Sequence, residues 1–211
     1  MKTVKSTWKL SAVGCVVIVF FIISIIVIIA GIVILVNVNH DIKKGVNEAE
    51  DVITHNDDPH DNKMPEAYTI NAGKAGDYSD AIAILTFIDD KNAKVGIFNG
   101  ITNDILRKGA GRDTNTALPN ESGNCVLYAH RDSGFASLTT IKINDCISLQ
   151  TKQSTLTYHV TDVRITTPND PSIYAKTDEK QVTLVTCYPF SYVGPAPQRC
   201  VVTADADKTG Q

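Results

Sequence analysis

Charged residues are missing from one long stretch of the sequence. From Leu10 to Val36 the chain of 211 residues has no Asp, Glu, Lys or Arg, and only two serines and two glycines interrupt its apolar residues. A helix rises about 1.5 Å per residue, so a stretch of this length spans roughly 40 Å, which exceeds the roughly 30 Å hydrocarbon core of a bilayer. The sequence therefore excludes a fully cytosolic protein and predicts a transmembrane anchor at residues 10–36.

The same stretch lacks the cleavage site of a secretory signal peptide. Ala30-Gly31 is followed directly by large aliphatic residues, and the apolar run is about twice as long as a usual signal-peptide core. Three lysines precede the run within residues 1–9, whereas no Lys or Arg follows it before Lys43. The positive-inside rule then predicts a single-pass protein with a cytoplasmic N-terminus at residues 1–9 and everything after about residue 37 outside the cell.

Positive charge is scarce beyond the anchor. Residues 37–69 carry three lysines against eight acidic residues, and residues 70–211 carry 14 basic against 15 acidic residues. Without a basic field, nucleic acid is not an expected partner. The acidic composition of residues 37–69 is typical of a solvated extracellular stalk, which we expect to be partly helical near residues 41–54.

The stalk contains histidines and carboxylates close together in sequence. It has no cysteine ligand and no ordered scaffold that would hold such a cluster in a metal-binding geometry. We therefore expect no metal site there, and nothing else in the sequence indicates a cofactor. The residues concerned are His55, Asp57, Asp58, His60 and Asp61.

Long helical patterns are absent after about Ile70, where short apolar or alternating runs separated by turn residues take over. Seven or eight strands at such short spacing predict a mainly β fold, a closed or nearly closed β-barrel over residues 70–211. Two short helices are also expected, at 103–108 after the capping residue Thr102 and at 133–141 after Asp132. The predicted strands are residues 81–88, 93–98, 124–129, 146–151, 155–167, 181–187 and 199–204.

Cysteine is infrequent, and four of the five cysteines lie outside the anchor: Cys125, Cys146, Cys187 and Cys200. An even number in an extracellular domain is compatible with two disulfides or with buried thiols. Cys187 differs from the others because it ends a predicted strand directly before Tyr188-Pro189-Phe190. Since proline cannot extend a central strand ladder, this thiol is expected at the rim of the sheet, a position suited to a nucleophile.

A cysteine nucleophile needs a proton-transfer partner and a group that stabilises an oxyanion. His130 ends a predicted strand as Cys187 does, whereas His159 lies in the middle of an alternating strand and is expected to face solvent or to pair across strands. Arg199 follows Cys187 by 12 residues and begins the last strand. Cys200 alternates to the opposite face, so we expect a core thiol there. Spacing alone leaves the Cys187, His130 and Arg199 set a hypothesis.

These residues carry a resemblance to a known family. Thr183-Leu184-Val185-Thr186-Cys187, Ala129-His130-Arg131-Asp132 and Gln198-Arg199, in this order, resemble the signature of the sortases, cysteine transpeptidases of Gram-positive cell surfaces. The resemblance covers about residues 80–204 and implies an eight-stranded sortase-like β-barrel. It also implies Cys187 as the nucleophile, His130 as the general acid/base and Arg199 as the residue that stabilises the oxyanion or the substrate.

The segment 187–190, Cys-Tyr-Pro-Phe, followed by Arg199 is most similar to class D sortases, with classes E and C as the alternatives. The sequence departs from the family at Ala129, at Arg112 and at Asn144-Asp145, where a Gly-Asp turn is usual. Asparagine tolerates positive φ better than most residues, so the last change is mild.

The resemblance further implies a function. The enzyme would cleave an LPxTG/LPxTA-like sorting signal of secreted surface proteins after Thr through a thioacyl intermediate, and transfer the protein to an amine such as that of a peptidoglycan precursor. Substrate contacts are expected from Thr186 and Tyr188 and, in the connection after residue 166, from Ile173 and Tyr174.

Other functions are compatible with parts of this pattern. A class C-like pilin-polymerising sortase is one alternative, and a membrane-anchored but catalytically inert β-barrel binding module is another. A papain-like peptidase fits less well because its nucleophile begins a helix and precedes its histidine, whereas His130 precedes Cys187 here.

Overall fold

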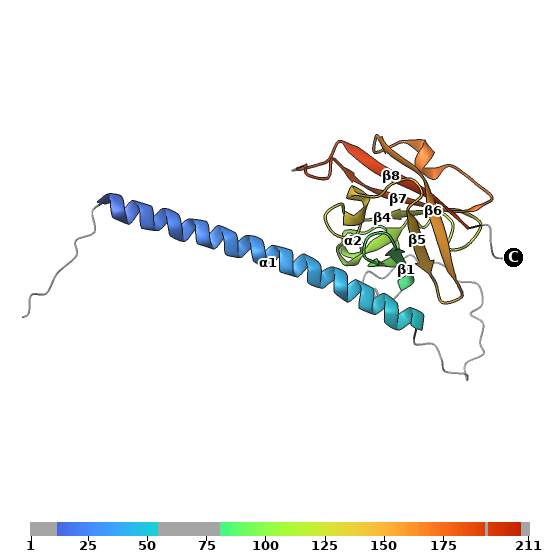
Figure 1. Cartoon of the computed structure of the whole chain (residues 1–211), viewed down its shortest axis with the longest axis horizontal. Helices are drawn as coiled ribbons and strands as arrows, with labels where there is room; N and C mark the ends of the chain where they lie inside the picture. Colours follow the sequence, from blue (N-terminus) through green and yellow to red (C-terminus); the bar gives the residue numbers. More distant parts are fainter. Residues whose placement is uncertain (1–11, 55–80, 193, 208–211) are drawn as a thin grey trace, which may run out of the picture. The chain divides into compact units, whose positions relative to one another are not determined.

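The computed structural model describes residues 12–54, 81–192 and 194–207 (Figure 1). The chain divides into two compact units, Met1–Asn39 and His40–Gln211. The histidines and carboxylates at 55–61 lie outside the described residues, so the expectation that they bind no metal stays a prediction.

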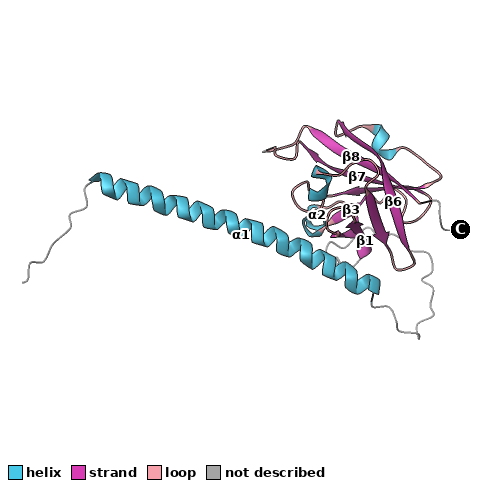
Figure 2. Ribbon diagram, viewed as in Figure 1, coloured by secondary structure: helices cyan, strands magenta, loops and turns pink. Residues whose placement is uncertain are grey.

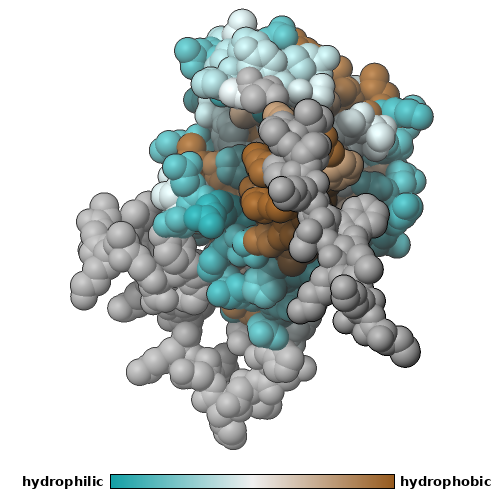
Figure 3. All heavy atoms as spheres, turned by 90° about the vertical axis from the view of Figure 1, so that its left-hand side faces the viewer, coloured by the Kyte–Doolittle hydropathy of each residue, from teal (hydrophilic) through white to brown (hydrophobic). Residues whose placement is uncertain are grey.

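The first unit contains most of a long helix, α1 (Ala12–Thr54). The part of α1 that lies in this unit includes a segment long and apolar enough to cross a membrane, as the uncharged run predicts. Its large aliphatic side chains are exposed from Val17 to Val36. Figure 3 shows brown apolar residues exposed on the face of the molecule that is turned toward the viewer. Apolar exposure of this extent is expected of a helix that contacts lipid rather than water.

The second unit is built around a closed eight-stranded barrel, which confirms the predicted fold (Figure 2). The strands follow one another around the barrel in the order β1-β2-β3-β4-β7-β8-β6-β5. Two neighbouring pairs, β2/β3 and β4/β7, are parallel, and the others are antiparallel. The strands are β1 (Ala81–Phe87), β2 (Ala93–Asn99), β3 (Ala110–Arg112), β4 (Gly123–Tyr128), β5 (Cys146–Gln150), β6 (Thr155–Thr166), β7 (Lys180–Tyr188) and β8 (Gln198–Ala206).

Strand β7 is buried on both faces. Val182 and Leu184 belong to the barrel core, whereas Val185 belongs to a smaller apolar cluster outside the barrel. The 3-10 helix η2 (Pro171–Tyr174) covers this outer cluster with Ile173. A strand with cover on both faces is held rigidly by its neighbours, so the residues at its end have fixed positions.

Residues 41–54 are helical as expected, but one face of this segment is buried rather than solvated. Ala49 and Ile53 pack with Ile84 and Phe98 of the barrel. The backbone of Gly45 lies close to the barrel, because a Cβ built on it would meet the Lys108 carbonyl oxygen at 2.1 Å. Three acidic residues flank this packed face and form ion pairs with basic residues of the same unit: Asp41 with Arg107 at 3.8 Å, Glu48 with Lys108 at 3.0 Å and Glu50 with Lys94 at 2.6 Å.

The second predicted helix is wrong in extent. Helix α2 (Asn103–Lys108) forms as expected, and the Thr102 side chain accepts a hydrogen bond from the Ile105 amide. At 133–141, however, the structure has turns and one 3-10 helix, η1 (Ala136–Thr139), which no side chain caps. The backbone of Gly134 approaches Ala129 closely and the last residues include two threonines, and both features disfavour a regular helix.

The Asn144-Asp145 turn has the backbone geometry that the sequence suggested. Asn144 has a φ of 75°, which is the left-handed conformation usually occupied by glycine. The Asp145 carboxylate accepts a hydrogen bond from the Lys142 amide at 2.8 Å and closes this turn. The departure from the family's Gly-Asp pattern is therefore accommodated without a change of fold.

Candidate active site

The antiparallel ladder between β7 and β8 brings the candidate nucleophile and the candidate cation together. Cys187 and Arg199 are directly paired across these strands. Directly opposite residues on one face of an antiparallel pair have Cβ atoms about 5 Å apart. Both residues are partly exposed, and both lie where the strands reach the rim of the barrel. The predicted strand-end position of Cys187 is therefore confirmed, and Arg199 is its immediate cross-strand neighbour.

His130 approaches the same rim from strand β4. The parallel register of β4 and β7 places Tyr128 opposite Val185, and continuing it brings His130 level with Cys187. Two further hydrogen bonds extend this register beyond β4. The Ala129 amide donates to the Val185 carbonyl at 3.3 Å, and the Thr186 hydroxyl donates to the Ala129 carbonyl at 2.7 Å. The residue directly before the candidate acid/base is thus tied through both its amide and its carbonyl to the strand that carries the candidate nucleophile.

The Arg199 guanidinium is oriented by its own loop. Its Nη1 donates to the carbonyl oxygens of Ala196 at 3.2 Å and Gln198 at 2.9 Å. Arginine has five N–H donors in a rigid fork, so these contacts fix the plane of the group and leave other donors for an incoming carbonyl or oxyanion. The positive charge lies at the same rim as the Cys187 thiol.

Two tyrosines lie on the outside of β4 and η2. The hydroxyls of Tyr128 and Tyr174 are 2.7 Å apart, and the Tyr174 hydroxyl also donates to Asp113 at 3.1 Å. Burial and the hydrogen bond to Tyr174 raise the pKa of Tyr128 well above its usual value, although Arg199 opposes this rise. Both phenols are therefore neutral at physiological pH and can act as hydrogen-bond donors or acceptors beside the candidate cation.

The four expected substrate contacts differ in how far they are exposed. Thr186 and Ile173 are 2% and 1% exposed, so neither presents a side chain to solvent in this structure. Their contacts indicate positioning roles, because Thr186 holds the segment before His130 and Ile173 fills the apolar cluster outside β7. Tyr174 is exposed and Tyr188 is half-buried, so of the four these two are accessible.

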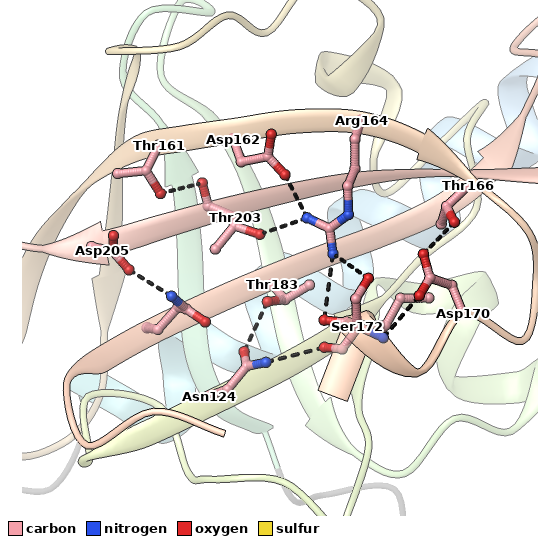
Figure 4. A network of polar contacts seen from close by, with 12 residues as sticks. Asn124, Thr161, Asp162, Arg164, Thr166, Asp170, Ser172, Thr183, Thr203 and Asp205 are labelled. Atoms are coloured by element: carbon pink, nitrogen blue, oxygen red, sulfur yellow. Dashed lines mark hydrogen bonds and ion pairs between the residues drawn. The ribbon is translucent and has the colours of Figure 1, made fainter. Parts of the chain in front are cut away.

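A polar network fixes the η2 segment against the barrel (Figure 4). Arg164 on β6 donates to Asp162 at 2.5 Å and to both the carbonyl and the hydroxyl of Ser172 in η2. The Thr166 hydroxyl and the Ser172 amide donate to Asp170, and these bonds lower the pKa of Asp170 to about 2. Asn124 on β4 reaches the same segment by donating to the Ile173 carbonyl at 3.1 Å, so the loop is attached from two sides.

The remaining outer cysteines are free thiols rather than disulfides. Cys125 and Cys200 are both 2% exposed, and burial raises their pKa values to about 12 and about 11. The expectation that Cys200 is a core thiol is confirmed. Cys146 is partly exposed and lies beside His159, so the expectation that this histidine pairs across strands is confirmed as well.

Sequence reasoning did not single out Arg131, which follows the candidate acid/base. Its Nη2 donates to the Tyr192 carbonyl in the loop between β7 and β8, while its Nη1 is buried without a partner among the described residues. This bond connects the segment after His130 with the loop that leads to Arg199. Loop-to-loop contacts of this kind carry no local sequence signal, since they depend on where the two strands end.

Comparison with known proteins assigns this fold to one family. A family model of the Sortase domain matches residues 87–207. Sortase D of Bacillus subtilis (strain 168) is 37% identical over 112 residues, which cover 53% of this chain and 57% of that protein. Sortase A of Streptococcus agalactiae serotype III (strain NEM316) is 29% identical over 133 residues, covering 59% of this chain and 52% of that protein. The chain thus spans somewhat more than half the length of these relatives.

Solved structures agree with the sequence matches. The Sortase D5 transpeptidase of Clostridium perfringens has a TM-score of 0.55 and 27% identity, covering 62% of this chain and 81% of that one. Sortase C from Clostridium perfringens SM101 has a TM-score of 0.56 and 26% identity, covering 82% of this chain and 90% of that one. The chain belongs to the sortase family, whose members are cysteine transpeptidases.

Proposed function

We propose that this protein is a class D sortase whose catalytic residues are Cys187, His130 and Arg199. The observation that carries the proposal is the register around β7, which pairs Cys187 with Arg199 and brings His130 level with both. The 37% identity to a relative described as Sortase D supports the class. The substrate would be an LPxTG/LPxTA-like sorting signal of a secreted surface protein.

In the first half-reaction the Cys187 thiolate attacks the carbonyl carbon of the substrate Thr. Arg199 donates hydrogen bonds to the oxyanion that forms, and His130 gives a proton to the departing amine as the Thr–Gly or Thr–Ala bond breaks. The products are a thioester on Cys187 and the released C-terminal fragment. We assign substrate contacts to Tyr174, which is exposed, and to Tyr188, which is half-buried.

In the second half-reaction an amine, such as that of a peptidoglycan precursor, attacks the thioester. His130 takes the proton from this amine, and the collapse of the second tetrahedral intermediate forms a new amide and expels the Cys187 thiolate.

The apolar part of α1 is consistent with anchoring in the cell membrane. We propose a single-pass orientation in a Gram-positive bacterium, with the N-terminus in the cytoplasm and the barrel outside, where secreted substrates and cell-wall precursors meet. The asymmetry of lysines around the apolar segment supports this orientation.

A peptide-cleavage assay tests the proposal. The full chain in detergent is incubated with a Leu-Pro-x-Thr-Gly or Leu-Pro-x-Thr-Ala peptide and a panel of amines, and both the released fragment and the ligated product are quantified by mass spectrometry. Cys187→Ala should abolish both products, whereas the matched substitution Cys146→Ser at the other accessible thiol should retain them. Cleavage that survives in Cys187→Ala would overturn the assignment.

A further inference from the structure

A second Cys–His pair lies on the outside of the barrel. Cys146 and His159 are directly opposite on β5 and β6, and the Cys146 Sγ is 3.3 Å from the His159 Nδ1. The other ring nitrogen, Nε2, is 2.7 Å from the carboxylate of Asp207. Asp207 is held in place because its amide donates to the Thr157 carbonyl at 3.0 Å. Cysteine, imidazole and carboxylate therefore form one ordered chain of contacts.

These contacts favour one tautomer of the His159 imidazole. A carboxylate on Nε2 favours the tautomer that carries its proton there, and this leaves the Nδ1 lone pair directed at the sulfur. Histidines that bind metals typically have this arrangement: a carboxylate orients the ring through one nitrogen, and the other nitrogen coordinates the metal.

The charge around Cys146 disfavours a nucleophilic role. Asp89 accepts a hydrogen bond from the Cys146 amide at 2.7 Å, and Asp145 is its neighbour in sequence. Asp207 lies beyond the histidine, so carboxylates surround the pair, and their negative charge attracts a cation.

We propose that Cys146 and His159 bind a thiophilic divalent cation of the Zn²⁺ type, with Asp207 as the outer-shell partner of the histidine. Zn–S and Zn–N bonds of about 2.3 and 2.05 Å at a tetrahedral angle place sulfur and nitrogen about 3.5 Å apart. The observed 3.3 Å needs an opening of only a few tenths of an ångström.

The protein supplies two of the ligands. Within the described part of the chain, no three His, Cys, Asp or Glu side chains converge on one point in the manner of a closed structural metal site. Cys146 lines a hollow of about 260 Å³ together with Asp89 and Asp145. His159 and Asp207 lie outside the lining of this hollow, and both are partly exposed, so solvent reaches the pair from the histidine side as well.

This site is separate from the rim that carries Cys187. On β6 the residue opposite Arg199 is Thr166, whereas His159 is opposite Asp205. Seven residues of strand at about 3.3 Å each place the two positions roughly 23 Å apart along β6. Binding at Cys146 can therefore be measured without the catalytic groups.

A charge-transfer titration tests the proposal. The reference is the full chain in detergent with Cys15→Ser and Cys187→Ala, in which Cys146 is the remaining accessible thiol. Cd²⁺ should produce a thiolate-to-metal absorption band, and Zn²⁺ should compete for the same site and raise the thermal unfolding temperature. Cys146→Ser should abolish the band, and His159→Gln should weaken binding.

Asp207→Asn is the discriminating variant. It should retain the band but lower the affinity by about 10- to 100-fold, as expected for the loss of an outer-shell partner. The exposed carboxylate Asp178 provides the matched control, and Asp178→Asn should leave the affinity unchanged. The proposal is overturned if no band appears, if the band persists in Cys146→Ser, or if the two aspartate variants behave alike.

Discussion

The packing of residues 41–54 against the barrel predicts that alanine at Gly45 disturbs this contact, whereas alanine at Gly31 of the same helix does not. A Cβ built on Gly45 would lie 2.1 Å from the Lys108 carbonyl oxygen, whereas one built on Gly31 meets nothing within 4 Å. Ordinary C···O contacts are about 3.3 Å or longer, so Gly45→Ala must move this part of the helix away by about 1 Å. Gly31→Ala has no such cost and gains up to about 1 kcal/mol of helix propensity.

The size of the effect follows from what the movement exposes. Ala49 is fully buried and Ile53 is 8% exposed, and both lie on the packed face beyond Gly45. Burying an isoleucine contributes about 1.5–3 kcal/mol and an alanine methyl about 0.8 kcal/mol. Partial loss of both contacts lowers the free energy of undocking by about 2–3 kcal/mol, which corresponds to a roughly 30- to 150-fold change in the equilibrium.

Native-state hydrogen exchange of the full chain in detergent measures this difference. In Gly45→Ala the amides of residues 45–54 should lose protection by that factor, and those of β2, against which they pack, should lose part of theirs. Gly31→Ala should leave both regions as in the wild type. Equal protection in the two variants would show that the close approach at Gly45 does not hold the helix to the barrel.

Three further perturbations test the site and the core. Thr186→Val removes the hydroxyl that donates to the Ala129 carbonyl, so turnover should fall at least several-fold while alkylation of the nucleophile persists; unchanged turnover would refute its positioning role. Tyr158→Phe leaves the buried Asn120 amide oxygen without its hydrogen-bond donor, so urea denaturation should show a free energy of unfolding lower by about 1–3 kcal/mol. An unchanged free energy of unfolding would show that this hydrogen bond does not stabilise the fold. Hydrogen bonds from the Thr166 hydroxyl and the Ser172 amide lower the pKa of Asp170 to about 2, whereas its value in the unfolded chain is about 3.9. The charged carboxylate therefore stabilises the folded state above about pH 4, and this stabilisation is lost as the pH falls through 2. Chemical shifts of residues 167–175 should report this loss, and Asp170→Asn should not show the same transition.

The sequence predicted the seven strands that have an apolar or alternating run and missed β3, which is too short for either pattern. β3 has three residues, Ala110, Gly111 and Arg112, which is too short for a period of two to be visible. Its existence depends on neighbours far away in the chain, because it is parallel to β2 and antiparallel to β4. Tertiary pairing rather than local preference defines such a strand.

The packed helix shows the same limit in another form. Gly45 and Ala49 are small residues in an acidic segment, so the hydropathy of this segment does not predict a buried face. Their significance lies in the facing surface, where Gly96 leaves no room for a side chain because a Cβ there would meet the Gly45 carbonyl oxygen at 2.6 Å. Close backbone approach requires small residues on both partners, and one sequence does not reveal which glycines face each other.

The two Cys–His pairs explain why local sequence could rank one thiol and not the other. Cys187 precedes a proline at a strand end, and this signal is local. Cys146 acquires its partner only through the β5/β6 register, and its charge environment only through a loop and the last strand. Arg199 is the cross-strand neighbour of the first thiol and carboxylates surround the second, so we propose different chemistry for the same pair of residue types in the two places.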